Sequence, residues 1–165
     1  MADQTLTERL QPSLLDRLMD AEPGSMKEGR EDRVIDLRRL REIVQRDLSW
    51  LLNVSDNGRM IPEEEYPHAA RSVLNYGIRE VAGAFSNAAN AFDIRTSILR
   101  AVQRFEPRIN PDTIEVRMRE TDMDGRAVVS FDIIADMWAQ PMPVELYLRT
   151  DLDLTTGQIR LERGM

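Results

Sequence analysis

The chain has 165 residues, 42% of them hydrophobic and 31% charged, which is the composition of an ordinary globular protein with one domain. Its net charge of -7 disfavours nucleic acid and anionic lipid as main partners. The absence of cysteine excludes disulfides and thiolate chemistry, and no apolar stretch approaches the ~18 residues of a membrane span, so we expect a cytoplasmic protein without direct membrane insertion.

Residues 1–31 differ from the remainder in composition and predict an N-terminal arm with one short amphipathic helix. Pro12 can begin this helix, which carries three leucines at helical spacing: Leu14, Leu15 and Leu18. The helix is too short to be stable alone, and turn-prone residues follow it directly. Two alternatives therefore stand, in which the leucines pack on the chain's own core or the arm becomes ordered against a partner.

Residues 32–165 are expected to form a single domain whose first half is helical. A long helix from Asp32 to Leu51 is predicted by apolar residues at steps of three or four: Val34, Leu37, Leu40, Val44, Leu48 and Leu51. A shorter helix is expected over 68–76, and the small residues of 82–90 indicate a connection or a further helical turn. The third helix is predicted over 93–105, with Asp93 as its N-cap.

After residue 110 the apolar period changes from 3.6 to 2, which is typical of strands with one solvated face. A hairpin is predicted around the turn TDMDGR, and its inward positions are Ile114, Val116, Met118, Val129, Phe131, Ile133, Ala135 and Met137. Pro141 and Pro143 indicate a sheet edge before Val144, Leu146 and Leu148, and Gln158 to Glu162 form a last short strand. The expected fold is therefore α+β in two layers, with N-terminal helices packed on a C-terminal antiparallel β-meander.

Few residues offer enzyme chemistry, and we predict no catalytic, metal or cofactor site. His68 is the single histidine, so a transition-metal site or a serine triad would lack partners. Asp122 and Asp124 resemble the start of a calcium loop, but their place between two strands favours a hairpin turn. No phosphate-binding or dinucleotide-binding glycine motif occurs.

The stretch RFEPRI, residues 104–109, closes the third predicted helix, because Pro107 cannot continue it. Three interpretations of Glu106 and Arg108 are open. A glycosidase could use Glu106 as its acid, although the neighbouring Arg108 and Arg104 would tend to keep that carboxylate ionised. The pair could instead be a salt-bridged corner, or a preorganised surface for another protein.

Five stretches taken together resemble TssE, the small baseplate wedge family of the bacterial type VI secretion system, which is similar to the lysozyme-like wedge protein of contractile phage tails. They are PSLLDRL (12–18), LRRLREIVQRDLSWLLN (37–53), ARSVLNYGI (70–78), RFEPRI (104–109) and MWAQPMPVELYLRTDLDLTTG (137–157). They occur in the family's order over most of the chain.

The resemblance implies a structural role beside TssF, TssG and TssK, around a spike hub, as the platform on which the TssB/TssC sheath polymerises. The family's Glu-Pro-Arg motif falls on Glu106, Pro107 and Arg108, which implies an interface that holds the wedge together. The predicted edge strand with Val144, Leu146 and Leu148 could pair with a sheath subunit by strand addition. A peptidoglycan muramidase is the alternative function that we retain.

Overall fold

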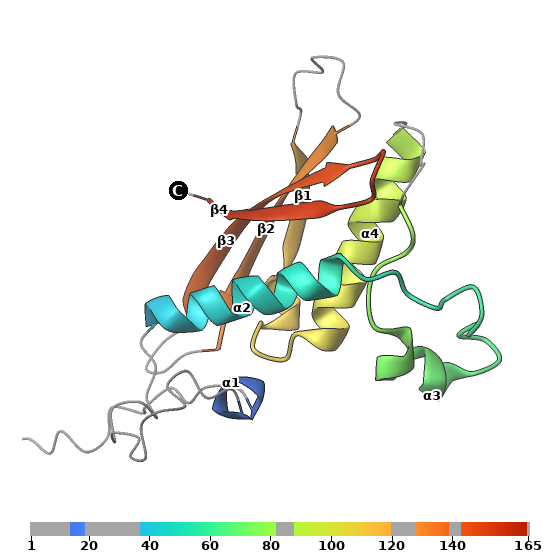
Figure 1. Ribbon diagram of the computed structural model, residues 1–165, viewed down its shortest axis with the longest axis horizontal. Coiled ribbons are helices and arrows are strands. Elements are labelled where there is room, and N and C mark those ends of the chain that lie inside the picture. Colours follow the sequence, from blue (N-terminus) through green and yellow to red (C-terminus); the bar gives the residue numbers. More distant parts are fainter. Residues whose placement is uncertain (1–13, 19–36, 82–87, 120–127, 139–142, 165) are drawn as a thin grey trace, which may run out of the picture.

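The computed structural model describes residues 14–18, 37–81, 88–119, 128–138 and 143–164, and it confirms the α+β fold class (Figure 1). Helices come first along the chain and a four-stranded antiparallel sheet comes last. The helices are α1 (Leu14–Leu18), α2 (Leu37–Leu52), α3 (Pro67–Ala70) and α4 (Ala88–Phe105), with short 3₁₀ turns η2 (Val73–Asn75) and η3 (Pro111–Thr113). The strands are β1 (Glu115–Arg119), β2 (Val128–Met137), β3 (Val144–Asp153) and β4 (Ile159–Arg163).

Helix α2 confirms the long amphipathic helix, although residues 32–36 of the predicted span lie outside the described ranges. Its buried side comprises Leu40, Ile43, Val44, Leu48, Leu51 and Leu52. The helix is joined to the far end of the sheet by Asn53, whose side chain donates to the Ile159 carbonyl at 2.8 Å and accepts from the Ile159 amide at 2.9 Å. These two bonds tie the carboxyl end of α2 to the start of β4.

The predicted helix over 68–76 is wrong as a single element. It is divided into α3 and η2, because Ser72 adopts an extended conformation between them and its hydroxyl accepts from the Leu74 amide at 3.2 Å. A serine that caps a new turn in this way competes with continuation of the preceding helix. The side chains of Val73 and Leu74 consequently remain exposed.

Helix α4 begins earlier than predicted, so Asp93 lies within the helix and is not its N-cap. The helix starts at Ala88, inside the segment for which we left a connection and a further helical turn open. Asp93 instead forms an ion pair with Arg79 at 2.6 Å. The predicted end is confirmed, because the helix stops at Phe105, just before Glu106 and Pro107.

The sheet has the order β1-β2-β3-β4, and all three pairings are antiparallel. This order corrects the predicted edge, since β3 is an inner strand and β1 and β4 are the outer ones. The hairpin register pairs Met118 with Phe131, yet Met118 is 55% exposed because it lies at the end of an outer strand. The turn TDMDGR, Asp122, Asp124 and Pro141 lie outside the described residues, while the last strand is confirmed one residue further along, at Ile159–Arg163.

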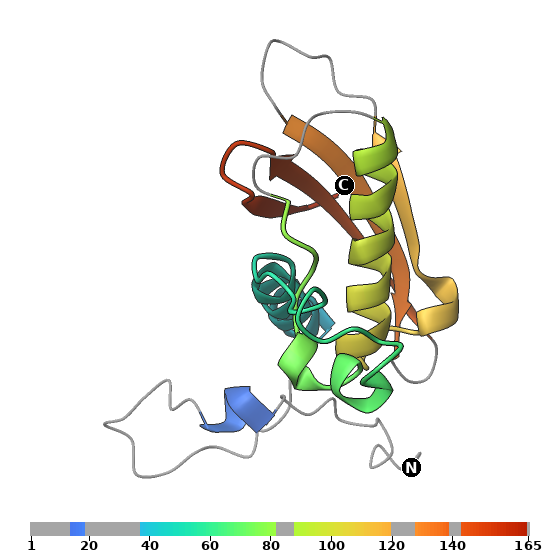
Figure 2. The same ribbon diagram turned by 90° about the vertical axis from the view of Figure 1, so that its right-hand side faces the viewer.

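The core lies between one face of the sheet and the helices α2 and α4, as Figures 1 and 2 show from two sides. Phe131, Ile133 and Leu148 of the sheet and Leu48 and Ile98 of the helices are at most 1% exposed. The other face of the sheet is covered by no described helix (Figure 2). Two layers with a single core follow from this arrangement.

Candidate protein-interaction site

The RFEPRI corner joins the end of α4 to the sheet through main-chain hydrogen bonds. The Glu106 amide donates to the Val102 carbonyl at 3.0 Å, which completes the helix, and the Ile109 amide donates to the Glu106 carbonyl at 3.2 Å. The Trp138 amide then donates to the Arg108 carbonyl at 2.8 Å. The corner is therefore attached at both ends, and Pro107, with no N–H to satisfy, points its exposed ring outward.

Glu106 and Arg108 form a salt bridge inside the molecule, because the Glu106 side chain is only 4% exposed. Oε1 of Glu106 accepts from Nε of Arg108 at 2.6 Å and from the Arg108 amide at 3.1 Å, and Oε2 accepts from Nη2 at 2.5 Å. Such a bidentate pair fixes the orientation of both groups. The salt-bridged corner, one of the three readings of the sequence, is thus what the structure contains.

A third charged residue, Asp47 of α2, extends this pair to a second helix. Nη2 of Arg108 donates to Oδ2 of Asp47 at 2.6 Å across 61 residues of sequence. Burial of Arg108 opposes its charge, but the hydrogen bonds and charges of Glu106, followed by those of Asp47, outweigh burial and raise the pKa of Arg108 well above its ordinary value. Arg108 is therefore a permanent cation that holds α2 and α4 together.

The network continues from Asp47 to the N-terminal helix α1. Arg46 donates to Oδ1 of Asp47 at 2.7 Å and to Oδ1 of Asp16 at 2.6 Å. The hydrogen bond to Asp16 contributes most to raising the pKa of Arg46, and its guanidinium lies 4.8 Å from the ring centroid of Trp50. Charges of alternating sign thus connect α1, α2 and the corner.

A groove of about 550 Å³ opens beside this network, and we refer to it as the corner groove. Its floor is apolar, and the Asp47–Arg108–Glu106 network forms one side. Trp50 is 47% exposed at its margin and Leu15 of α1 is 46% exposed. Its lining comprises Leu15, Leu40, Ile43, Asp47, Trp50, Leu51, Tyr76, Phe105, Glu106, Pro107 and Arg108.

The other residues that the sequence singled out as an interface are divided between surface and core. Of the three arm leucines, Leu15 borders the corner groove and Leu18 is 75% exposed, while the Leu14 side chain lies outside the described part of the chain. Leu146 and Leu148 are buried, with exposed fractions of 3% and 1%, and Val144 is half-buried. Any partner at this strand would therefore contact its main chain and not these two leucine side chains.

Sequence reasoning missed Asp47, Arg46, Trp50 and Tyr76, which complete the site. A signal for Asp47 was present, because this acidic residue lies between the apolar positions Val44, Leu48 and Leu51 of a predicted helix. A carboxylate beside a buried stripe requires a cationic partner. Its partner is distant in sequence, so the helical pattern could not identify it.

Tyr76 yields a prediction on alkaline pH. Burial, followed by the charges of Asp47 and Glu106, raises the pKa of Tyr76 above its ordinary value of 10.0. Above pH 10.0 the folded chain keeps the Tyr76 proton that the unfolded chain loses. The contribution of Tyr76 to the free energy of unfolding is therefore fully present below pH 10.0 and is lost as the pH rises through the raised pKa. Tyr76→Phe, which retains the edge-to-face contact with Phe105 at 5.2 Å, should flatten this decline in urea unfolding measured against pH. An alkaline profile that Tyr76→Phe leaves unchanged would contradict the assignment.

Within the described residues, no group of three or more His, Asp or Glu side chains is placed to hold a metal ion, and no helix is long and apolar enough to cross a membrane. His68 lies exposed on α3. The corner groove offers an apolar floor, an exposed aromatic ring and a fixed cation, which are features of protein-interaction sites.

Comparison with known proteins identifies one relationship. The family described as baseplate wedge protein gp25 matches residues 38–142, from the first turn of α2 to the connection after β2. The match includes the whole Asp47–Arg108–Glu106 network. No curated protein and no solved structure was found to match the chain.

Proposed function

The chain belongs to the family of the baseplate wedge protein gp25, and from this membership we propose that it is the wedge subunit of a type VI secretion baseplate. Its structural role in a phage-like baseplate follows from the family, which matches more than half of the chain. The finer assignment is that it joins TssF, TssG and TssK around a spike hub and serves as the platform for the TssB/TssC sheath. We place this assembly in the cytoplasm, recruited to an apparatus anchored in the inner membrane.

The observation that carries the proposal is the position of the charged network beside the corner groove. The network locks α2 to the end of α4, so the surface at their junction is rigid before a partner arrives. Preorganised surfaces with an exposed aromatic residue and a partly buried arginine have the features of protein-interaction sites. Glu106 and Arg108 then act by shaping the interface, and Pro107 and Trp50 are positioned to contact the partner.

The state of Glu106 favours this role over a peptidoglycan muramidase. Both of its carboxylate oxygens accept hydrogen bonds from Arg108, so neither is available to donate a proton to a glycosidic oxygen. Asp47, the other carboxylate of the network, is itself held between Arg46 and Arg108. The corner therefore lacks the free pair of carboxyl groups that this chemistry needs.

The sheath contact is proposed at the amino end of β3. Pairing of β3 with β4 begins at Leu148, and the Gly164 amide donates to the Tyr147 carbonyl at 3.1 Å. Residues 144–146 therefore extend past β4 with no described strand beside them on that side. A strand from a sheath subunit could add there through main-chain hydrogen bonds in place of Arg41, whose Nη2 donates to the Glu145 carbonyl at 3.4 Å. The leucine side chains would remain in the core.

Co-purification tests the interface. A tagged chain is expected to recover TssF and TssG from the same cells, and Trp50→Ala should reduce that recovery strongly while the variant remains folded. Tyr66→Ala is the matched control, because Tyr66 is an aromatic residue with a similar exposure of 55% that does not line the corner groove. Equal recovery by the Trp50 and Tyr66 variants would reject the corner groove as the contact.

A further inference from the structure

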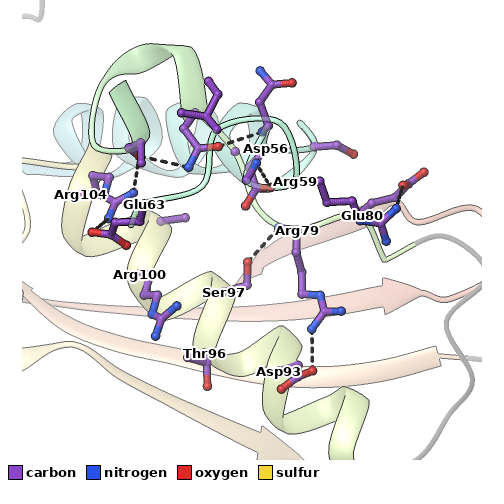
Figure 3. A pocket seen from close by; sticks show the side chains of 18 of the residues that line it. Asp56, Arg59, Glu63, Arg79, Glu80, Asp93, Thr96, Ser97, Arg100 and Arg104 are labelled. Atoms are coloured by element: carbon purple, nitrogen blue, oxygen red, sulfur yellow. Dashed lines mark hydrogen bonds and ion pairs between the residues drawn. The ribbon is translucent and has the colours of Figure 1, made fainter. Parts of the chain in front are cut away.

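A groove of about 740 Å³ lies between α4 and the loops on either side of α3, and its charges are largely matched within the molecule (Figure 3). Of the four arginines that line it, three face carboxylates of the same groove. The pairs are Arg79 with Asp93 at 2.6 Å, Arg104 with Glu63 at 3.8 Å and Arg59 with Glu80 at 3.9 Å. This balance leaves little to select a ligand. The corner groove differs, because a segment of the chain itself already lies on it.

That segment is α1, and it makes two kinds of contact with the corner groove. Leu15 is one of the lining residues. Oδ1 of Asp16 accepts from Nη1 of Arg46 at 2.6 Å, and the Asp16 side chain is only 11% exposed. The groove of the isolated chain therefore holds an apolar side chain and the carboxylate next to it in sequence.

Asp16 completes the hydrogen bonding of Arg46. Nε and Nη2 of Arg46 both donate to Oδ1 of Asp47, at 2.9 and 2.7 Å, and Nη1 donates to Asp16. Without Asp16, the two cations Arg46 and Arg108 are balanced by the carboxylates of Asp47 and Glu106. One further carboxylate therefore fits at Nη1 of Arg46, while the net charge of -7 disfavours a ligand that is more acidic.

The attachment of α1 to the corner groove is weak. A helix of five residues has little stability of its own. Leu15 remains 46% exposed and Leu18 75% exposed, so these two side chains bury little apolar surface. A partly exposed ion pair such as Asp16–Arg46 shifts an equilibrium by up to about fivefold. A ligand that fills the groove better can therefore replace α1.

The groove also keeps binding capacity that α1 does not use. Nη1 of Arg108 is buried and has no hydrogen-bond acceptor among the described residues. A buried donor without an acceptor is destabilising, so a segment that brings an acceptor to this nitrogen gains an interaction that α1 lacks. Trp50, which is 47% exposed at the margin of the groove, offers additional apolar surface. A partner segment larger than α1 can use both groups.

We infer that α1 is an internal stand-in for the partner of the corner groove. The partner presents a short amphipathic helix of the same chemistry, with an apolar side chain in the place of Leu15 and one carboxylate on Nη1 of Arg46. Binding of this helix displaces α1, which stays attached to the chain through residues 19–36. The inference rests on the corner groove being the contact surface of the proposed function, and it adds the kind of segment that binds there.

The covalent attachment makes α1 a competitor of the partner. A tethered segment acts at an effective concentration on the order of 1 mM, so even a weak contact keeps the groove covered for part of the time. Weakening the contact of α1 should therefore strengthen binding of the partner. The opposite effect is expected if α1 is itself a part of the bound interface, so the direction of the change separates the two cases.

A peptide with the sequence of residues 11–20, QPSLLDRLMD, carries the inferred chemistry and serves as the probe. The peptide is labelled with fluorescein, titrated with the full chain up to the order of 1 mM, and followed by anisotropy. Asp16→Arg in the chain should strengthen binding of the peptide by about threefold or more, because it removes the ion pair of the competing α1.

Two further variants control for charge and for the binding site. Glu42→Arg makes the same change of charge on α2, where Glu42 pairs with Arg38 and Arg39 and does not line the groove. It should stay within about twofold of the parent. Arg46→Ala combined with Asp16→Arg removes the cation that receives the peptide's carboxylate, so the gain in affinity should disappear. Thermal unfolding verifies that each variant is folded.

Several results would overturn the inference. They are a peptide that binds none of the chains, equal affinities for the parent and the Asp16→Arg chain, an equal gain from Glu42→Arg, or a gain that persists in the double variant. Lower recovery of TssF and TssG by Asp16→Arg than by the parent would also overturn it, because higher recovery is expected. If the parent recovers neither protein, the proposed function is rejected, while the peptide titration still decides whether α1 occupies a binding site.

Discussion

Arg108→Ala is expected to lower the free energy of unfolding by about 3–5 kcal/mol, the typical cost of removing one partner from a buried ion pair. The variant leaves Glu106, 4% exposed, without its guanidinium, and separates Asp47 from the corner. For a chain of this length the midpoint of thermal unfolding should fall by roughly 6–20 °C. The measurement is urea unfolding together with a thermal scan.

A double variant separates the effect of the unpaired charge on stability from the effect of lost packing. Glu106→Leu combined with Arg108→Met removes the buried carboxylate together with its partly buried partner and keeps apolar volume, so it should recover most of the lost stability. If Arg108→Ala instead costs less than about 1 kcal/mol, the value of a solvent-exposed pair, the network does not hold α2 and α4 together.

Gly77→Ala is expected to be the second large effect, at about 3 kcal/mol or more from backbone strain and a lost hydrogen bond. Gly77 has a φ of 125°, and an added Cβ would lie 2.3 Å from the Val54 carbonyl oxygen. The same oxygen accepts from the Ile78 amide at 2.9 Å. The substitution therefore breaks the parallel bridge between Ser55 and Ile78.

Gly58→Ala is the matched control for this prediction. Gly58 lies in the loop that precedes α3, and its added Cβ would meet only the flexible carboxylate of Asp56, at 3.2 Å. The midpoint of thermal unfolding should be close to that of the parent for Gly58→Ala and well below it for Gly77→Ala. Equal midpoints for the two variants would show that the close approach at residue 77 is relieved at little cost.

The helices and strands of the core could be predicted because their signal is local. Ile94, Ile98 and Val102 place one face of α4 in the core, and the alternation around Phe131 and Ile133 predicts the inner face of β2. Pro107 likewise predicted the end of α4. In each case, residues within a few positions of one another determine the outcome.

The predictions from the sequence failed where contacts between distant segments determine the structure. Arg108, the partner of the buried Glu106, also donates to Asp47, which is far away in sequence, so the stretch RFEPRI alone left its three interpretations open. The order of the strands, and with it the inner position of Leu146 and Leu148, is set by pairing along the whole sheet. The division of the predicted helix at Ser72 shows a single side-chain hydrogen bond outweighing an apolar pattern.

The family membership and the charged network give complementary information about the candidate site. Membership explains why the chain should bind neighbours in a phage-like baseplate. In the interface that we propose, Glu106 and Arg108 act by orienting α2 and α4, which carry Trp50 and the Pro107 corner at the groove. An interface residue in this sense need not contact the partner.

Site-specific photo-cross-linking in the assembled baseplate tests this claim most directly. A photoreactive phenylalanine analogue replaces Trp50 in one variant and Tyr66 in another, and the cross-linked proteins are identified by mass spectrometry. We predict that the analogue at position 50 is joined to a neighbouring baseplate subunit and that the one at position 66 is joined far less. Assembled baseplates in which position 50 captures no other chain would contradict the account.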